Sequence, residues 1–376
     1  MNQRTIKVGM DARPLLNEGS GVGYYIKRLV SSLALFSDIH FKLFSSSFKN
    51  RFVKNEHFEN LPIDIFDIPV PVTLFNFMSQ KFMYPPIENL IAETDILHTP
   101  HCYYIPSKCQ NQIITIHDLF HLKEPGLTRI EKPEREFKII KRSAERAKKI
   151  IAVSNFTKKN IIEILGIPGD KIEVIYSAPS LFPNAIEKSK KNDSAVKTIL
   201  TVGTLERRKN YLNLLEAFKI AKKRINDIKL IVVGKDGLCA KEIKSKAYQM
   251  KMGEKETIFT GYVKEMELIN LYNNADLFVF PSLEEGFGFP PLDAMNFGVP
   301  VISSKTGSLP EILMDAPYYI DCHDPESIAE AILEVLEDDE LRENMILKGE
   351  KVSSSYSWKS TAERTYKLYR KILGFE

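Results

Sequence analysis

Short β-branched runs alternate with helical patterns along this chain, and the alternation limits the fold more than any other feature. The runs IKVGMDA (6–12), QIITIHDL (112–119) and KIIAVS (149–154) have the length of strands, and a segment with helical periodicity follows each of them. Strands that alternate with helices form parallel sheets, because each parallel connection needs a crossover. The first half of the chain is therefore predicted to be an α/β domain.

A second series of such units begins near residue 196. Its six apolar runs are TILTVG, KLIVVG, ETIFTGYV, DLFVFPS, VPVISS and APYYID, which predict a doubly wound sheet. The polar, proline-interrupted stretch 177–195 separates the two series and has the composition of a linker. With 376 residues the chain has the length of two domains of about 180 residues each.

We therefore predict two Rossmann-like domains that face each other across a cleft, in the α/β class. The last helical pattern, SWKSTAERTYKLYRKIL, is long enough to pack back onto the first domain. The predicted boundaries are an N-terminal domain at 1–180, a linker at 181–195, a C-terminal domain at 196–356 and a returning helix at 357–376.

Composition excludes several classes of protein. Four scattered cysteines without C-x-x-C spacing indicate neither a disulfide framework nor a zinc ribbon, and fit a reducing cytoplasm. No apolar run approaches the roughly 20 residues that cross a bilayer, so we expect neither a secreted nor an integral protein. A net charge of +3 argues against a nucleic-acid partner. Residues 1–180 carry 24 Lys+Arg against 19 Asp+Glu, an excess that favours an anionic surface.

Open α/β sheets bind ligands beyond the carboxyl ends of their strands, and the first such loop is rich in glycine. Gly19, Gly21 and Gly23 follow strand one and precede a helix that we expect to begin near Tyr24. Glycine lets a backbone approach a ligand, and the N–H groups at a helix N-terminus attract phosphate. A phosphate or acceptor loop and a plain turn both fit this spacing.

The second loop carries histidine. His117 and Asp118 end the strand IITIHD, where a histidine can donate a hydrogen bond to a sugar hydroxyl or to a developing charge. The alternative is a polar pair that caps its own backbone. The pairs His98/His101 and His117/His121 suggest a metal, but no acidic or thiol ligands accompany them, so we expect no metal site.

The third loop, VGTLERRKN (202–210), is basic. Its strand ends at Gly203, and Arg207, Arg208 and Lys209 precede a helix. Cations ahead of a helix N-terminus oppose the helix dipole unless an anion lies there. We interpret the cluster as a diphosphate site, with charge-assisted hydrogen bonds from Arg208 and Lys209; solvated surface charges are the alternative.

The fourth loop, EEGFGFPPLDAM (284–295), holds two acids eight positions apart. Glu285 lies in the glycine-rich loop, and the proline pair after it predicts a short helix with Asp293 in its first turn. An acid in a first turn is also an ordinary partner of the helix dipole. Glu285 has no such structural reason and is the stronger candidate for binding a hydroxylated ligand.

Taken together, these loops resemble the retaining GT-B glycosyltransferases of glycosyltransferase family 4 over nearly the whole chain. The strongest elements are PSLEEGFGFPPLDAMNFGVPVISSKTGSLPEI (281–312), VGTLERRKN and TIHDL, supported by DARPL with GSGVGYY. The residues of these motifs are most similar to those of the bacterial mannosyltransferase-like branch that builds O-antigens.

The resemblance implies roles for particular residues. Glu285 takes the place of the acid that contacts hydroxyls of the transferred sugar, and Asp293 stands where the family has a glutamate that contacts ribose. Arg208 and Lys209 match the phosphate-binding pair, while Thr204 stands where many relatives have a further arginine. The remaining implied donor contacts are His117, Gly21, Gly203, Gly286, Phe287 and Gly288.

The implied reaction is transfer of a hexose, most simply mannose from GDP-mannose, to a glycan or lipid-linked acceptor near Arg13, Gly19 and Tyr24. No D-x-D triplet occurs, so neither a metal nor another cofactor is expected. A UDP-sugar-dependent enzyme and a non-catalytic nucleotide-sugar-binding protein remain as alternatives; an epimerase or a phosphorylase would need groups that we do not find.

Residues 129–149 are rich in lysine and arginine around a sparse apolar face. Such a segment can rest on anionic lipid beside a lipid-linked acceptor, and a solvated helix is the alternative. We therefore expect a cytoplasmic protein, and we hypothesise that it associates peripherally with a membrane.

Overall fold

The computed structural model describes residues 4–17, 19–48, 58, 60–128, 132–183 and 196–375. The chain divides into two compact units. The N-terminal unit comprises Met1–Leu122, Lys132–Ser177 and Ser357–Glu376, and the C-terminal unit comprises Lys123–Glu131 and Ala178–Tyr356. Most of the predicted linker, residues 184–195, lies outside the described residues.

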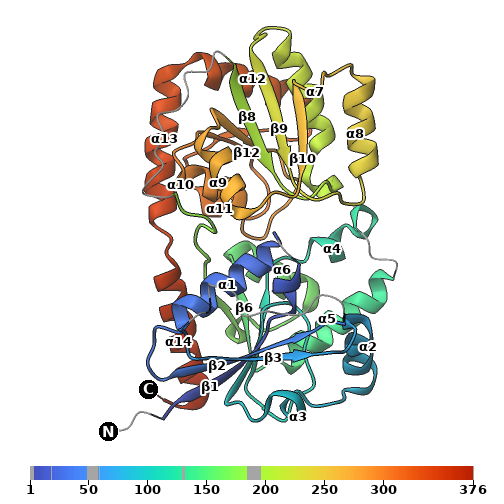
Figure 1. Cartoon of the computed structure of the whole chain (residues 1–376), viewed down its shortest axis with the longest axis vertical. Helices are drawn as coiled ribbons and strands as arrows, with labels where there is room; N and C mark the ends of the chain where they lie inside the picture. Colours follow the sequence, from blue (N-terminus) through green and yellow to red (C-terminus); the bar gives the residue numbers. More distant parts are fainter. Residues whose placement is uncertain are drawn as a thin grey trace. The chain divides into compact units, whose positions relative to one another are not determined.

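The N-terminal unit is built on a seven-stranded parallel sheet with the order β3-β2-β1-β4-β5-β6-β7 (Figure 1). Strands such as β5 are buried along their whole length, as expected where helices cover both faces of a parallel sheet. The strands are β1 Ile6–Asp11, β2 Ile39–Ser46, β3 Ile63–Ile68, β4 Ile96–Thr99, β5 Gln112–Ile116, β6 Lys149–Ala152 and β7 Ile172–Val174.

Helices up to residue 177 fall between these strands. They are η1 Arg13–Leu16, α1 Gly21–Leu33, α2 Val72–Phe82, α3 Glu88–Ile91, α4 Phe120–Lys123, η3 Pro125–Leu127, α5 Pro133–Arg146, α6 Asn155–Leu165 and η4 Gly169–Lys171.

The C-terminal unit has a six-stranded parallel sheet with the order β10-β9-β8-β11-β12-β13, and its strands are the six predicted runs. The order reverses beside β8, so the ends of β8 and β11 form a switch point, where doubly wound sheets bind ligands. The strands are β8 Lys197–Val202, β9 Ile228–Val233, β10 Thr257–Gly261, β11 Leu277–Phe280, β12 Val301–Ser304 and β13 Tyr318–Ile320.

Helices pack on this second sheet around a core that includes Leu214, Phe218 and Ile332. The helices after residue 196 are η5 Arg207–Lys209, α7 Tyr211–Lys222, α8 Ala240–Gln249, α9 Glu265–Asn273, α10 Phe289–Asn296, α11 Leu309–Leu313, α12 Pro325–Glu337, α13 Asp339–Ser354 and α14 Trp358–Leu373.

Helix α14 belongs to the N-terminal unit, as the sequence predicted. Its Tyr369 hydroxyl lies 2.6 Å from Nδ1 of buried His98, and Thr361 donates a hydrogen bond to the carbonyl of Tyr176 at 2.7 Å. Figure 1 shows α14 running back to the sheet that holds the N-terminus, near α1. No helix in the described part of the chain is both long and apolar enough to span a membrane.

Helix α1 begins earlier than predicted, at Gly21 and not near Tyr24. Ser20 is its N-cap, and its Oγ accepts a hydrogen bond from the backbone N–H of Gly23 at 2.9 Å. A Cβ at residue 23 would lie only 2.9 Å from that oxygen, so this glycine allows the cap to form. The glycine-rich stretch is therefore partly a helix start.

Candidate functional site

Three of the predicted site residues meet at the switch point of the C-terminal sheet. Arg208 and Lys209 lie in η5, after β8, and Glu285 lies in the loop after β11. Lys209 Nζ is 2.6 Å from Glu285 Oε1, and Arg208 Nη1 is 2.7 Å from Oε2. Glu285 is 7% and Lys209 9% exposed, so these charges are shielded from solvent. Arg208 and Lys209 are therefore not solvated surface groups, whereas Arg207 is exposed and lies 3.5 Å from Glu242.

The cluster carries more positive than negative charge. Burial opposes ionisation of Glu285, but Arg208 and Lys209 outweigh it, and the pKa of this carboxyl lies below its usual range. Burial is also the main effect on Lys209 and lowers its pKa, against the attraction of Glu285. Two cations and one carboxylate leave a formal charge of about +1, which favours an anionic ligand.

Lys209 retains hydrogen-bonding capacity. Glu285 is the only hydrogen-bond partner of its ammonium among the described residues, and an ammonium has three N–H donors. Its Nζ also lies 4.9 Å from the centroid of the Phe280 ring. The side chain passes Gly203, where a Cβ would lie 3.1 Å from Lys209 Cε and 3.0 Å from the Tyr211 hydroxyl. Gly203 thus leaves room for the lysine.

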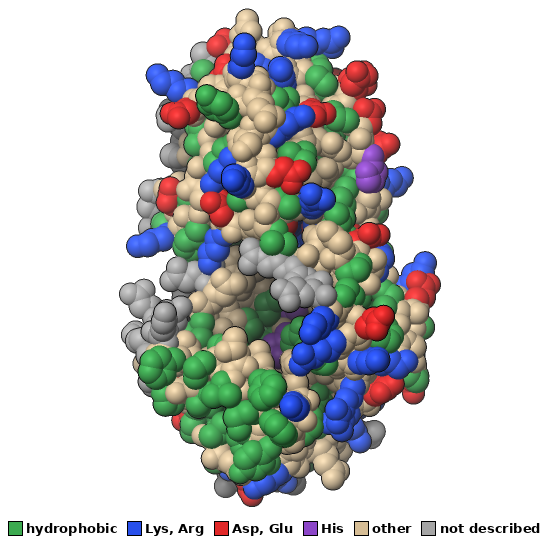
Figure 2. All heavy atoms as spheres, turned by 90° about the vertical axis from the view of Figure 1, so that its right-hand side faces the viewer, with side chains coloured by type: hydrophobic (Ala, Val, Ile, Leu, Met, Phe, Trp, Pro, Cys, Tyr) green, Lys and Arg blue, Asp and Glu red, His purple; other side chains and the backbone are tan. Residues whose placement is uncertain are grey.

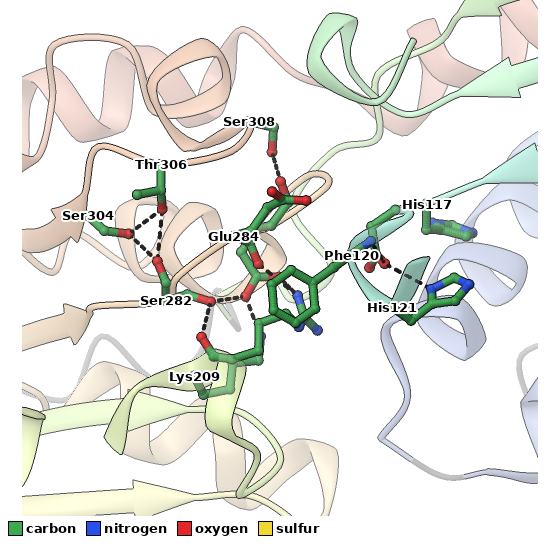
Figure 3. Close-up of polar contacts among 12 residues, drawn as sticks. His117, Phe120, His121, Lys209, Ser282, Glu284, Ser304, Thr306 and Ser308 are labelled. Carbon is green, nitrogen blue, oxygen red and sulfur yellow. Dashed lines mark hydrogen bonds and ion pairs between the residues drawn. The ribbon is translucent and has the colours of Figure 1, made fainter. Parts of the chain in front are cut away.

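Hydroxyl groups that the sequence analysis did not select hold the acidic loop in place. Ser282 donates to Glu285 Oε1 at 2.5 Å. The carbonyl of Ser282 in turn accepts from Ser304 at 2.5 Å and from Thr306 at 2.9 Å (Figure 3). Ser304 ends β12 and Thr306 follows it, so a second strand end positions the Glu285 carboxylate through Ser282.

The backbone of Glu285 is held as well. Its carbonyl accepts from the Ser308 amide at 3.0 Å and from the Ser308 hydroxyl at 2.9 Å. Gly307 has φ of +59°, and a Cβ there would lie 2.7 Å from Glu285 N and O. Only glycine fits this approach. The signal for this support was the stretch SSKTGS (303–308), whose small and hydroxyl side chains follow a strand.

The glycine-rich segment after Glu285 is buried. Phe287 is 5% exposed, and its ring packs 5.2 Å from that of Phe289 and 6.1 Å from that of Tyr356, between centroids. Gly288 has φ of +96°, and a Cβ would lie 2.7 Å from Leu309. The Phe287 side chain therefore supports the loop, and ligand contacts predicted for Gly286, Phe287 and Gly288 would come from their backbone.

Asp293 does not lie where the sequence placed it. Helix α10 begins at Phe289, so Asp293 falls beyond its first turn. Its Oδ1 accepts from the amides of Ser180 at 2.6 Å and Leu181 at 3.1 Å, and its Oδ2 accepts from the Ser180 hydroxyl at 2.6 Å. Asp293 is 3% exposed and anchors the start of the longer segment of the C-terminal unit, which begins at Ala178. The ribose contact implied by the resemblance would have to add to these bonds or displace one of them.

Arg13, a predicted acceptor ligand, is already engaged in the N-terminal unit. Its Nε and Nη2 donate to Asp11, and its Nη1 donates to Asn76 at 2.6 Å. His101 Nε2 lies 2.6 Å from Asp11. Burial opposes ionisation of Asp11, but Arg13 and His101 outweigh it and hold the pKa of Asp11 well below its usual range. This cluster fixes the loop after β1.

The other predicted residues of this loop lie at the start of α1. Gly19 has φ of +72°, in the left-handed region, and Gly21 is the exposed first residue of the helix. Tyr24 lies in the first turn, where its amide donates to the Ser20 carbonyl at 3.0 Å. The arrangement offers N-terminal amide groups of a thirteen-residue helix, as the phosphate or acceptor hypothesis needs.

His117 has a defined tautomer. Its Nε2 lies 3.2 Å from the carbonyl oxygen of Pro100, which can only accept, so Nε2 carries the proton. Burial lowers the pKa of His117 to about 4, and the ring is neutral at pH 7. The Tyr25 ring meets it edge-on at 4.9 Å. In this tautomer the remaining nitrogen, Nδ1, accepts a hydrogen bond from a hydroxyl, and the predicted donor role would need the other tautomer or a protonated ring.

The histidine pairs considered for a metal have other partners. His98 is buried between the hydroxyls of Tyr369 and Thr115, at 2.6 and 2.8 Å. His121 Nδ1 lies 3.8 Å from Asp118 (Figure 3). Within the described ranges, no three His, Cys, Asp or Glu side chains gather in a way that could hold a metal ion.

Two family models match the chain in succession. Residues 19–178 match the model described as Glycosyltransferase Family 4, and residues 183–352 match the model described as Glycosyl transferases group 1. The matches meet near the boundary between the two units.

Individual proteins resemble the chain as well. It is 30% identical over 285 residues to the O-antigen chain mannosyltransferase B of Escherichia coli, which covers 73% of this chain and 74% of that protein. Its fold is similar to that of sucrose-phosphate synthase from Thermosynechococcus elongatus, with a TM-score of 0.79, 18% identity and coverage of 99% and 100%. Anabaena HepE, solved with UDP and glucose, gives a TM-score of 0.72 at 15% identity over 97% of this chain and 100% of HepE.

Proposed function

We propose that this chain transfers a hexose with retention of anomeric configuration. The chain belongs to the GT-B glycosyltransferases of group 1 and family 4. The donor is a nucleoside diphosphate sugar, and the acceptor is a glycan or a lipid-linked saccharide. The observation that carries this proposal is the buried, net positive cluster of Arg208, Lys209 and Glu285 at the switch point of the C-terminal sheet.

In the proposed reaction the acceptor hydroxyl oxygen bonds to the anomeric carbon as the bond from that carbon to the diphosphate oxygen breaks. The leaving diphosphate keeps the electron pair and takes the proton of the acceptor. Arg208 and Lys209 stabilise the charge that develops on the diphosphate. Glu285 holds both cations and orients sugar hydroxyls, and Nδ1 of His117 accepts from another hydroxyl. We propose that the reaction needs no metal.

The donor is proposed to be GDP-mannose. Support comes from the name of the E. coli relative, a mannosyltransferase of O-antigen chains, and from the residues of the motifs in this chain. A UDP-sugar is the second candidate, because HepE, which shares the fold, was solved with UDP and glucose. The proposed product is part of a bacterial surface polysaccharide.

The acceptor in the synthesis of this polysaccharide is proposed to be lipid-linked. The enzyme would then work in the cytoplasm at the inner face of the plasma membrane. Arg13, Gly19 and Tyr24 stay predicted acceptor contacts, with Arg13 acting through the loop that it holds. The basic segment 129–149 supports a peripheral association with anionic lipid.

A thermal-shift titration with GDP, UDP, ADP, dTDP, GDP-mannose and UDP-glucose, with and without EDTA, tests the donor. A ligand at about 100 times its Kd stabilises the native state by roughly 2.7 kcal/mol. We expect shifts with GDP and GDP-mannose that Lys209→Ala reduces and that the exposed-lysine control Lys219→Ala keeps. A UDP preference would overturn the mannose assignment, and loss of the shift in EDTA would overturn metal independence.

Transfer itself separates an enzyme from a binding protein. GDP-mannose is incubated with the protein and saccharide acceptors, and release of GDP is followed. Acceptor-dependent release supports the enzyme; tight nucleotide binding without release under any acceptor supports the non-catalytic alternative.

A further inference from the structure

Helix α2 of the N-terminal unit presents apolar side chains to solvent. Leu74, Phe77 and Phe82 are 48%, 44% and 60% exposed, and Tyr84 just beyond the helix is 57% exposed. The thirteen residues 68–80 include no charged side chain. A surface helix ordinarily turns charged and polar residues to solvent. This exposed apolar face is therefore unusual and marks an interaction surface.

The single lysine of α2 lies against the exposed aromatic side chains of this face. Lys81 Nζ lies 5.2 Å from the centroid of the Phe77 ring and 5.4 Å from that of the Phe82 ring. The two rings are 5.8 Å apart and meet edge-on. The ammonium thus lies over both rings, and the flexible lysine side chain can carry it to phosphate groups when the rings enter an apolar phase.

Helix α5 of the same unit carries a stripe of basic side chains. Arg135, Lys138, Arg142 and Arg146 are spaced by three, four and four residues, which places them on one side of the helix. All four are exposed, and none forms an ion pair or a hydrogen bond through its side chain within the part of the chain that the structure describes. Among the described residues, the stripe is therefore not neutralised by ion pairs.

The acids of α5 do not cancel this charge. Five Lys and Arg side chains against three Glu side chains leave α5 a formal charge of about +2. Glu136 accepts a hydrogen bond from the Tyr103 hydroxyl, and Glu134 and Glu145 are exposed. At the start of the helix, Leu122, Pro133, Glu134, Phe137 and Lys138 line a shallow and largely apolar hollow. Charge and apolar surface thus occur together along α5.

The two helices face the same way. Figure 1 draws α2 and α5 at the same side of the N-terminal sheet. Figure 2, which looks onto that side, shows hydrophobic side chains gathered next to a group of lysine and arginine side chains. An apolar patch beside a basic patch is the combination that binds a lipid bilayer, because apolar insertion and attraction to anionic headgroups act together.

We propose that α2 and α5 form a docking surface for a bilayer with anionic headgroups. The apolar side chains of α2 enter the interface, and the stripe on α5 lies against lipid phosphates. A second copy of the chain is a poorer occupant, since the basic stripe beside the apolar patch is complementary to anionic headgroups and not to an equally basic surface. The inference rests on the proposed function only for its purpose, which is to bring the enzyme to a lipid-linked acceptor.

Flotation of the whole protein with vesicles tests the surface. The vesicles contain phosphatidylcholine alone or with 30% phosphatidylglycerol, and neither nucleotide nor acceptor is added. We expect at least about tenfold more bound protein on the anionic vesicles, and a fall as salt rises because salt screens the stripe. Equal binding to both vesicles, or none to the anionic ones, would overturn the proposal.

Variants separate the two helices. Phe77→Ser with Phe82→Ser, and separately Arg135→Gln with Arg142→Gln, should each reduce binding to anionic vesicles at least about tenfold. The matched controls Tyr248→Ser with Leu347→Ser remove exposed apolar residues of the C-terminal unit, which are 85% and 66% exposed, and should bind as the wild type does. Unchanged binding by the α2 variant would refute the insertion.

Two further readouts keep the result interpretable. The thermal midpoint of each variant shows whether it folds, and sedimentation shows whether α2 instead joins two copies. A wild-type dimer that the α2 variant loses, with vesicle binding unaffected, would assign the face to self-association and overturn the proposal. If the protein binds anionic vesicles but no nucleotide gives a thermal shift, the docking surface is supported and only the proposed function is rejected.

Discussion

Each unit of this protein holds a buried carboxylate between basic groups at the carboxyl ends of its strands, and the two clusters differ in what remains available. In the N-terminal unit Asp11 binds Arg13, two residues along the chain, and His101. In the C-terminal unit Glu285 binds Arg208 and Lys209, which are 77 and 76 positions away.

The difference lies in charge balance and donor use. Asp11 and Arg13 cancel, and Asn76 takes a further guanidinium donor, so that cluster serves to hold a loop. Glu285 cancels one of two cations, and the Lys209 ammonium keeps donors for a ligand. Burial alone therefore does not distinguish the two clusters, whereas the excess of charge and of hydrogen-bond donors does.

Removing the arginine of the N-terminal cluster gives the sharpest test of its structural role. We expect Arg13→Ala to lower the free energy of unfolding by about 3–5 kcal/mol, because it leaves the Asp11 charge buried with less compensation. Urea unfolding at pH 7 measures this loss, with Arg4→Ala, whose side chain is 74% exposed in its ion pair, as the control. Wild-type stability with impaired acceptor affinity would instead make Arg13 a ligand.

Removing the acid of the C-terminal cluster should affect chemistry. Glu285→Ala is expected to lower kcat by about 100- to 1000-fold, as loss of a transition-state contact does, and to leave nucleotide binding in place because both cations remain. Transfer assays with GDP binding run in parallel measure both effects, with Glu242→Ala as the surface control. Transfer at the wild-type rate would contradict the role of Glu285.

Lys209→Ala should weaken nucleotide binding and transfer together, by about 10- to 100-fold, the value of a charged hydrogen bond of about 1.5–3 kcal/mol. Titration calorimetry with the nucleoside diphosphate measures the affinity. Lys219→Ala is the control, since it changes an exposed lysine of α7. If only kcat falls and affinity is kept, Lys209 is not a diphosphate ligand in the ground state.

The smallest expected effect is a pH dependence of the free energy of unfolding that arises from a histidine of the N-terminal unit. Burial lowers the pKa of His98 to about 3, so the unfolded chain takes up its proton first as the pH falls. The stability from neutral His98 is present above about pH 6.5 and is lost progressively toward about pH 3.

Between pH 7 and pH 6 we expect a loss of about 0.7 kcal/mol from this group alone. Urea unfolding at the two pH values measures it, and His98→Gln should show a correspondingly smaller change, whatever its stability at pH 7. An identical pH dependence in the variant would show that His98 does not titrate between the folded and unfolded states.

The sequence by itself determined the two parallel sheets, the return of α14 and the gathering of Arg208 with Lys209. These depend on hydrophobic periodicity and on neighbours along the chain: buried runs such as QIITI form strands wherever helices cover them, and a cation pair ahead of a helix stays together because it is local.

Only the tertiary structure decided which distant group each buried polar atom meets. Asp293 bonds to Ser180, 113 positions away, Ser304 supports Ser282 because β12 pairs with β11, and the Pro100 carbonyl selects the tautomer of His117. The apolar stretch of α2 likewise did not show by its sequence that its side chains are exposed. A buried polar group must find a partner, and strand order, not sequence spacing, determines which one is within reach.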